Sequence, residues 1–66
     1  MILEITDWVN GIRRDNYVDT KQIDAIQKLP SKIAIFLKSG NIMYLEDIKS
    51  NESDIEVERI LKYWGR

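Results

Sequence analysis

Apolar and polar residues alternate along the first part of the chain, and this alternation predicts β-strands. The segment 2–9 leads directly into Asn10-Gly11, which favours a two-residue type I′ turn because both turn positions require positive φ. A hairpin in this register places Asp7 opposite Arg14, a pair of opposite charge. One side of its first strand is apolar, with Leu3, Ile5 and Val9.

The segment before Pro30 has two interpretations. Asp19 and Gln22 have the spacing of a capping box, which would begin a short helix that Pro30 ends. Alternatively, residues 23–29 form a strand and Pro30-Ser31 lies at the centre of a tight turn, where proline presets φ. We favour the strand.

The segment 32–48, KIAIFLKSGNIMYLEDI, predicts a second hairpin that turns at Ser39-Gly40. With a two-residue loop, alternation divides its apolar side chains between two faces. The first face carries Ile33, Ile35, Leu37, Ile42 and Tyr44. The second face carries Ala34, Phe36, Met43 and Leu45, with a polar rim of Lys32, Lys38, Asn41 and Asp47.

After Ile48 the apolar residues change to helical spacing. Ser53 and Glu56 form a capping box that begins the helix, and Gly65 can end it in the left-handed conformation. The helix has one apolar stripe, made of Val57, Ile60, Leu61 and Trp64. We expect this stripe to pack on the first face, whose β-branched residues suit dense packing on a sheet.

These elements predict a single α+β domain over residues 1–66, a small antiparallel β-meander with one C-terminal α-helix. Two arrangements of the second face remain open. The N-terminal hairpin folds over it and closes a small SH3-like barrel, or the face stays open as a docking site or dimer interface. Trp8 has two corresponding interpretations. If the hairpin covers the second face, Trp8 belongs to the core on the Phe36 side, and if the face stays open, Trp8 is an exposed neighbour of Arg13 and Tyr17. The candidate partner-binding residues are Phe36, Met43, Leu45, Trp8, Arg13 and Tyr17.

The composition disfavours catalysis. The 66 residues include neither cysteine nor histidine, so the chain lacks a thiolate nucleophile, a neutral-pH acid or base and the commonest metal ligand. The acidic residues at 52, 54, 56 and 58 cross the predicted start of the helix, where its dipole favours negative charge. We therefore expect a non-enzyme with no cofactor and no metal site.

Charge and hydropathy limit the choice of partner and location. Ten basic and eleven acidic residues leave a formal charge of −1, which argues against binding to phosphate backbones. The sequence shows no signal-peptide pattern and no apolar run of the length of a membrane span, so we expect a cytoplasmic protein without a membrane span.

The whole chain resembles the FlbD family of small bacterial flagellar proteins. The matching segments are MILEIT at the start, the Asn10-Gly11 turn, YVDTKQIDAI from Tyr17, LP at Leu29-Pro30, IAIFLKSG, and IEVERILKY near the end. This resemblance implies a short antiparallel sheet with a terminal helix and a non-catalytic role in motility. It implies no particular site residues.

The function we expect is that of a small regulator that docks on a larger protein or associates with itself as a homodimer. Two alternatives remain, a phage-type inhibitor of a host protein and a small β-barrel that binds nucleic acid. In the second alternative, phosphate contacts and base stacking would come from Arg13, Arg14, Trp8 and Tyr17.

Overall fold

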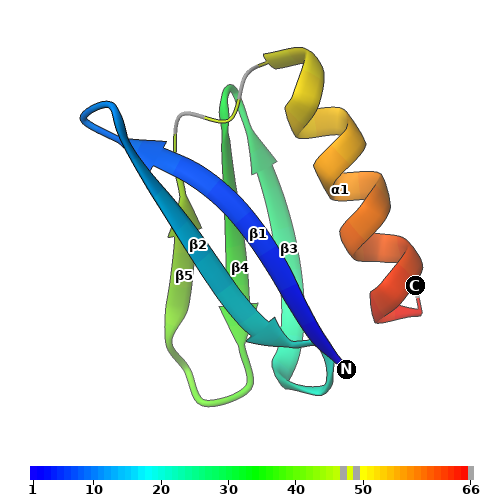
Figure 1. The fold of residues 1–66 in the computed structure, drawn as a ribbon. Helices are drawn as coiled ribbons and strands as arrows, with labels where there is room; N and C mark the ends of the chain where they lie inside the picture. Colours follow the sequence, from blue (N-terminus) through cyan, green and yellow to red (C-terminus); the bar gives the residue numbers. More distant parts are fainter. Residues whose placement is uncertain (47, 49, 66) are drawn as a thin grey trace.

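Five β-strands precede one α-helix in the computed structural model, which describes residues 1–46, 48 and 50–65, without the side chains of 50–53 (Figure 1). The elements are β1 (Ile2–Val9), β2 (Ile12–Asp19), the 3-10 turn η1 (Thr20–Gln22), β3 (Ile23–Leu29), β4 (Lys32–Leu37), β5 (Ile42–Leu45) and α1 (Ser50–Trp64). β1 and β2 form one antiparallel sheet, and β3, β4 and β5 form a second in that order. The predicted α+β class is confirmed.

The first hairpin forms in the predicted register. Asn10 and Gly11 have φ values of 52° and 76°, as a type I′ turn requires, and Asp7 lies opposite Arg14. Asparagine tolerates this left-handed conformation better than most residues with a β-carbon, and glycine has no steric penalty there. The turn therefore fixes which β1 side chains point inward.

Residues 23–29 form a strand, so the helical interpretation of this segment is wrong. The capping signal at Asp19 acts on a much shorter element, because its carboxylate accepts a hydrogen bond from the Lys21 backbone N–H (3.1 Å) at the start of η1. The predicted turn at Pro30-Ser31 is present and leaves Leu29 paired with Lys32.

The turn between β4 and β5 has three residues instead of the predicted two. The Gly40 N–H donates to the Leu37 carbonyl, and the Leu37 N–H donates to the Asn41 carbonyl (both 2.9 Å). Gly40 has a φ of 94°, so this is a type I turn followed by a left-handed glycine. Because side chains alternate along a strand, the extra residue moves every β5 side chain to the opposite face from the predicted one.

The inner face of the three-stranded sheet therefore carries Met43 and Leu45 opposite Ile35 and Ile33. Ile42 and Tyr44 lie on the other face, which corrects their predicted place beside Ile33 and Ile35. The hydrophobic core contains Leu3, Ile5, Val18, Ile23, Ile33, Ile35, Leu45, Ile48 and Ile60.

The helix packs on this inner face through three residues of the predicted stripe, while the fourth, Leu61, is half-buried outside the core cluster. Ile60 is fully buried, and Val57 and Trp64 pack against the core. The Trp64 indole N–H also donates to the Ile23 carbonyl (3.2 Å). The predicted start of the helix is wrong, since α1 begins at Ser50 and Ser53 lies inside its first turns.

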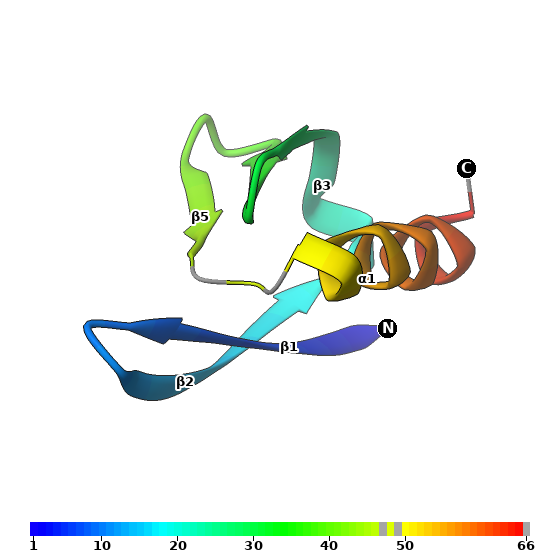
Figure 2. The ribbon, with the colours of Figure 1, turned by 90° about the horizontal axis from the view of Figure 1, so that it is seen from above.

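The N-terminal hairpin covers the same inner face as the helix (Figure 2). Its Leu3, Ile5 and Val18 join the core, while α1 lies beside β1 and β3. The expectation that the hairpin closes over Ala34 and Phe36 is therefore wrong. Both covering elements lie on one side of the three-stranded sheet, and its other side receives neither.

We expect Ile60→Ala to lower the free energy of unfolding by about 2–5 kcal/mol, because it leaves a cavity under the helix. Ile55→Ala provides a matched control on the same helix, since Ile55 is 62% exposed. It should change the free energy of unfolding by less than about 0.5 kcal/mol. Urea denaturation followed by circular dichroism measures both, and equal effects would contradict the assigned helix orientation.

Candidate protein-binding surfaces

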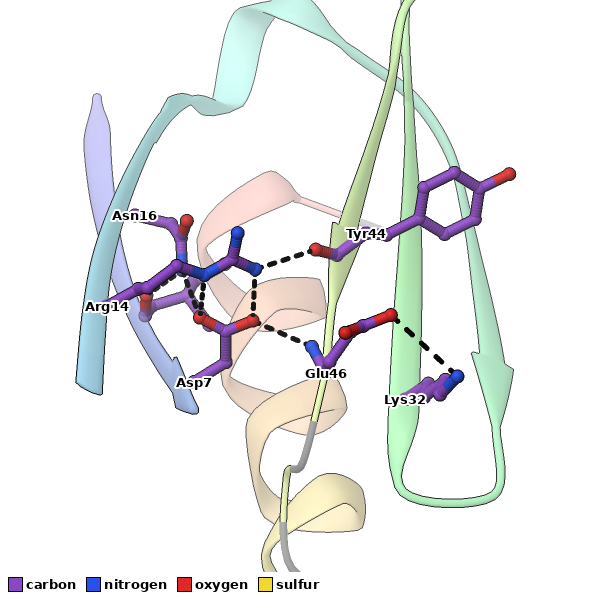
Figure 3. A network of polar contacts seen from close by, with 7 residues as sticks. Asp7, Arg14, Asn16, Lys32, Tyr44 and Glu46 are labelled. Atoms are coloured by element: carbon purple, nitrogen blue, oxygen red, sulfur yellow. Dashed lines mark hydrogen bonds and ion pairs between the residues drawn. The ribbon is translucent and has the colours of Figure 1, made fainter. Parts of the chain in front are cut away.

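A buried carboxylate joins the two sheets on the inner side of the molecule (Figure 3). Asp7, on β1, is fully buried and accepts both guanidinium hydrogen bonds of Arg14, from Nε at 3.1 Å and Nη2 at 2.6 Å. Asn16 Nδ2 donates to the same carboxylate at 2.8 Å, and the Glu46 backbone N–H donates at 2.7 Å. The Asp7 carboxylate thus connects both strands of the hairpin to the end of β5.

Two further hydrogen bonds strengthen this junction. Arg14 Nη2 donates to the Tyr44 carbonyl at 3.3 Å, and the Trp8 backbone N–H donates to the Glu46 carbonyl at 3.3 Å. β1 therefore meets the end of β5 by a strand-like contact. The junction fixes which face of the three-stranded sheet the hairpin covers.

Burial by itself raises the pKa of the Asp7 carboxyl, because it disfavours the charged form. The hydrogen bonds from Arg14, Glu46 and Asn16 and the positive charge of Arg14 together outweigh burial. The pKa of Asp7 therefore lies below its ordinary value of 3.8. Since the folded state holds the charged carboxylate, the junction stabilises the fold at pH values above the ordinary pKa of Asp7. This stabilisation is lost as the pH falls and Asp7 is protonated.

The opposite side of the three-stranded sheet is its outer face, defined here by Ala25, Ala34, Phe36, Ile42 and Tyr44. Cross-strand pairing places Ala34 between Gln27 and Tyr44, and Phe36 between Ala25 and Ile42. Ile42 is 41% exposed and Tyr44 55% exposed, while Phe36 is half-buried and the small Ala34 side chain is buried between its neighbours. Large apolar side chains therefore meet solvent on a regular sheet surface.

The outer face has a charged end. Lys32 Nζ lies 3.8 Å from Glu46 Oε1, and both side chains remain about half exposed. Of the predicted rim, Lys32, Lys38 and Asn41 are exposed. Asp47 lies outside the described residues.

The structure separates the predicted partner-binding residues into three groups. Phe36 lies on the outer face, as expected for a docking residue. Leu45 is fully buried and Met43 packs against the core, so neither contributes to an exposed patch, and this corrects their predicted place beside Phe36. The cause is again the three-residue turn, which rotates both side chains inward.

Trp8, Arg13 and Tyr17 form the third group, on the side of the hairpin that faces away from the core. Trp8 lies directly opposite Arg13, and it is 38% exposed, so its interpretation as core beside Phe36 is wrong. Arg13 pairs with Asp15 (Nε–Oδ1 3.1 Å). The negative charge of Glu4, opposite Tyr17, raises the pKa of the tyrosine hydroxyl, and a hydrogen bond between them adds to this.

Sequence reasoning missed Ile42 and Tyr44 as exposed residues. A signal was present, because glycine as the third residue of Lys38-Ser39-Gly40 is typical of a three-residue hairpin loop. The predicted two-residue loop overlooked it.

Within the described residues, no group of three or more acidic side chains is placed to hold a metal ion. No described helix has the length and apolar character needed to cross a bilayer. Comparisons with protein-family models, curated proteins and solved structures each found no match to this chain.

We expect Asp7→Asn to lower the free energy of unfolding at neutral pH by about 2–3 kcal/mol, because hydrogen bonds to a charged group are lost. The wild-type protein should lose part of its stability as the pH falls below about 4, and the variant should lose less over this range. Urea denaturation from pH 7 to pH 2 measures both curves. Asp15→Asn, on the exposed side of the hairpin, should cost less than about 1 kcal/mol at neutral pH. A neutral effect of Asp7→Asn would contradict the junction.

Proposed function

We propose that the protein is a small non-catalytic binding module that docks on a larger protein through its outer face. One observation carries this proposal: the helix and the hairpin both pack on the inner face, which leaves Ile42 and Tyr44 exposed beside Phe36 on the other. An apolar sheet surface with a charged rim is typical of an interaction site. Burying the exposed parts of Ile42 and Tyr44 would contribute about 1 kcal/mol each.

The size of the outer face favours a larger partner over a homodimer. Three strands about 4.8 Å apart, with about six residues each rising about 3.3 Å, make a footprint of about 300 Å². A stable interface buries about 800 Å² on each partner. A second copy stacked on this face alone would therefore give a weak dimer, whereas a larger partner can extend over the rim.

The arginine doublet supports a protein partner over a nucleic acid. Arg14 is held by Asp7, and Arg13 is paired with Asp15, so each guanidinium already has a carboxylate. Phosphate binding would have to compete with both ion pairs. A regulator of motility, as the FlbD resemblance implies, and a phage-encoded inhibitor are both settings in which such a module acts.

Two matched pairs of variants test the proposal. Ile42→Lys and Tyr44→Lys alter the outer face, while Ile12→Lys and Tyr17→Lys place the same charge on the hairpin, where the original side chains are 68% and 60% exposed. All four should fold, because the substituted side chains are exposed. The wild-type protein and the hairpin variants should capture the same partner from extracts of the organism of origin, and the outer-face variants should lose it.

Quantitative mass spectrometry of the captured proteins and light scattering of each variant measure these outcomes. Loss of the partner with Tyr17→Lys but not with Tyr44→Lys would contradict binding through the outer face. It would point to the side of the hairpin that carries Trp8 and Tyr17. Equal capture of the partner by all variants would contradict binding at either surface. The wild type could instead self-associate without capturing any other protein, and Tyr44→Lys could abolish that self-association. This result would mean that the outer face binds a second copy of the chain and not a larger partner.

A further inference from the structure

The free edge of β2 is open to solvent along most of its length. β2 pairs with β1 on one side, and no described strand pairs with it on the other. Residues 12–15 and Tyr17 are all exposed. An exposed strand edge of eight residues is a template on which a further strand can pair.

The turn register shows which backbone groups face this edge. Ile12 and the other even-numbered residues of β2 direct their N–H and C=O groups toward β1, so those of Arg13, Asp15 and Tyr17 point to the free edge. The opposite edge of the hairpin agrees with this direction, because the Trp8 N–H turns away from β2 and donates to the Glu46 carbonyl (3.3 Å). Among the described residues, the groups at the β2 edge have no hydrogen-bond partner.

The side chains on this edge define the chemistry of a matching strand. Arg13 and Asp15 form an ion pair (Nε–Oδ1 3.1 Å) whose side chains remain 63% and 41% exposed, so both can reach a neighbouring strand. Opposite charges and aromatic with β-branched residues are favourable pairs across strands. An antiparallel neighbour therefore matches this edge with a carboxylate beside Arg13, an ammonium beside Asp15 and a β-branched residue beside Tyr17.

The position of β5 favours a segment of another protein over a second copy of the chain. Two copies of β2 paired along their free edges would be related by a two-fold axis perpendicular to the joined sheet, with both three-stranded sheets on the same side. β5 lies behind β2 in Figure 1, and Arg14 Nη2 donates to the Tyr44 carbonyl (3.3 Å). The two copies of β5 would therefore collide next to the axis, whereas an extended loop or tail has no such layer behind it.

We propose that β2 binds an extended segment of another protein as an added antiparallel strand. From its N-terminal end, the segment carries a β-branched, a basic and an acidic residue at alternate positions, opposite Tyr17, Asp15 and Arg13. Its backbone exchanges hydrogen bonds with these three residues. The site lies on the hairpin, so it is separate from the outer face and does not depend on it.

The test uses the acetylated peptide TVTKTET, titrated into the ¹⁵N-labelled protein. In the antiparallel register, its valine lies opposite Tyr17, its lysine opposite Asp15 and its glutamate opposite Arg13. The amide signals of these three residues should shift, because their N–H groups gain hydrogen bonds. The signals of Ala34 and Tyr44, on the outer face, should not shift.

Three matched peptides separate charge from strand pairing. TVTETKT has the same composition with the two charges exchanged, and it should bind about tenfold more weakly because like charges then lie opposite each other. Methylation of the valine, lysine and glutamate nitrogens, which face β2, should weaken binding at least about tenfold. Methylation of the two inner threonine nitrogens, which face away from β2, should leave the affinity unchanged.

A charge-exchanged protein completes the design. Arg13→Glu combined with Asp15→Lys should fold, because both side chains are exposed, and it should prefer TVTETKT. Tyr44→Lys should bind TVTKTET like the wild type, which keeps this test independent of the proposed docking function.

Four results would overturn the proposal. They are equal binding of TVTKTET and TVTETKT by the wild type, no shifts at β2 with TVTKTET, unchanged binding after methylation of the nitrogens that face β2, and the same preference in the charge-exchanged protein as in the wild type. Shifts at β2 that depend on protein concentration without any peptide would instead assign this edge to a second copy of the chain, and would overturn it as well.

Discussion

The rest of the structure depends on the carboxylate of Asp7. A charge in a fully buried position is strongly unfavourable unless hydrogen bonds and an opposite charge replace water. Asp7 meets this requirement only when Arg14 and Asn16 of β2 and the backbone of Glu46 surround it together. Any packing that moves the hairpin away from the end of β5 removes the Glu46 hydrogen bond from this carboxylate.

This constraint selects one arrangement of a very small core. Apolar contacts alone would let the hairpin lie on either side of the three-stranded sheet, because both sides carry apolar residues. The Asp7 junction holds the hairpin on the inner face, where α1 is already packed through Ile60. The outer face keeps Ile42 and Tyr44 in solvent as a consequence, and the docking function proposed above rests on that asymmetry.

Local patterns predicted the elements well. The turn at Asn10-Gly11, the strand before Pro30 and the helical stripe around Ile60 each depend on residues close together in the sequence. The error in the orientation of β5 arose where one residue changes the outcome at a distance. The third loop residue, Gly40, reverses the side-chain orientation of β5, and it thereby exchanges Met43 and Leu45 for Ile42 and Tyr44 on the outer face.

The candidate site was predictable only in part for the same reason. Strand alternation alone places Phe36 on the face of Ala34 and puts Trp8, Arg13 and Tyr17 on one side of the hairpin, and the structure agrees. The role of Asp7 was not foreseen beyond its pairing with Arg14. It shares the inward parity of Leu3 and Ile5, but its partner Glu46 is 39 residues away in the chain.

Amide hydrogen exchange at Glu46 tests the junction most directly. Glu46 follows the last residue of β5, and its N–H donates to the buried Asp7 carboxylate instead of a neighbouring strand. The account predicts that this amide exchanges as slowly as the core amides of Ile33 and Ile35, because opening it requires separation of the two sheets. Exchange at the rate of an exposed loop amide, while the core amides stay protected, would contradict it.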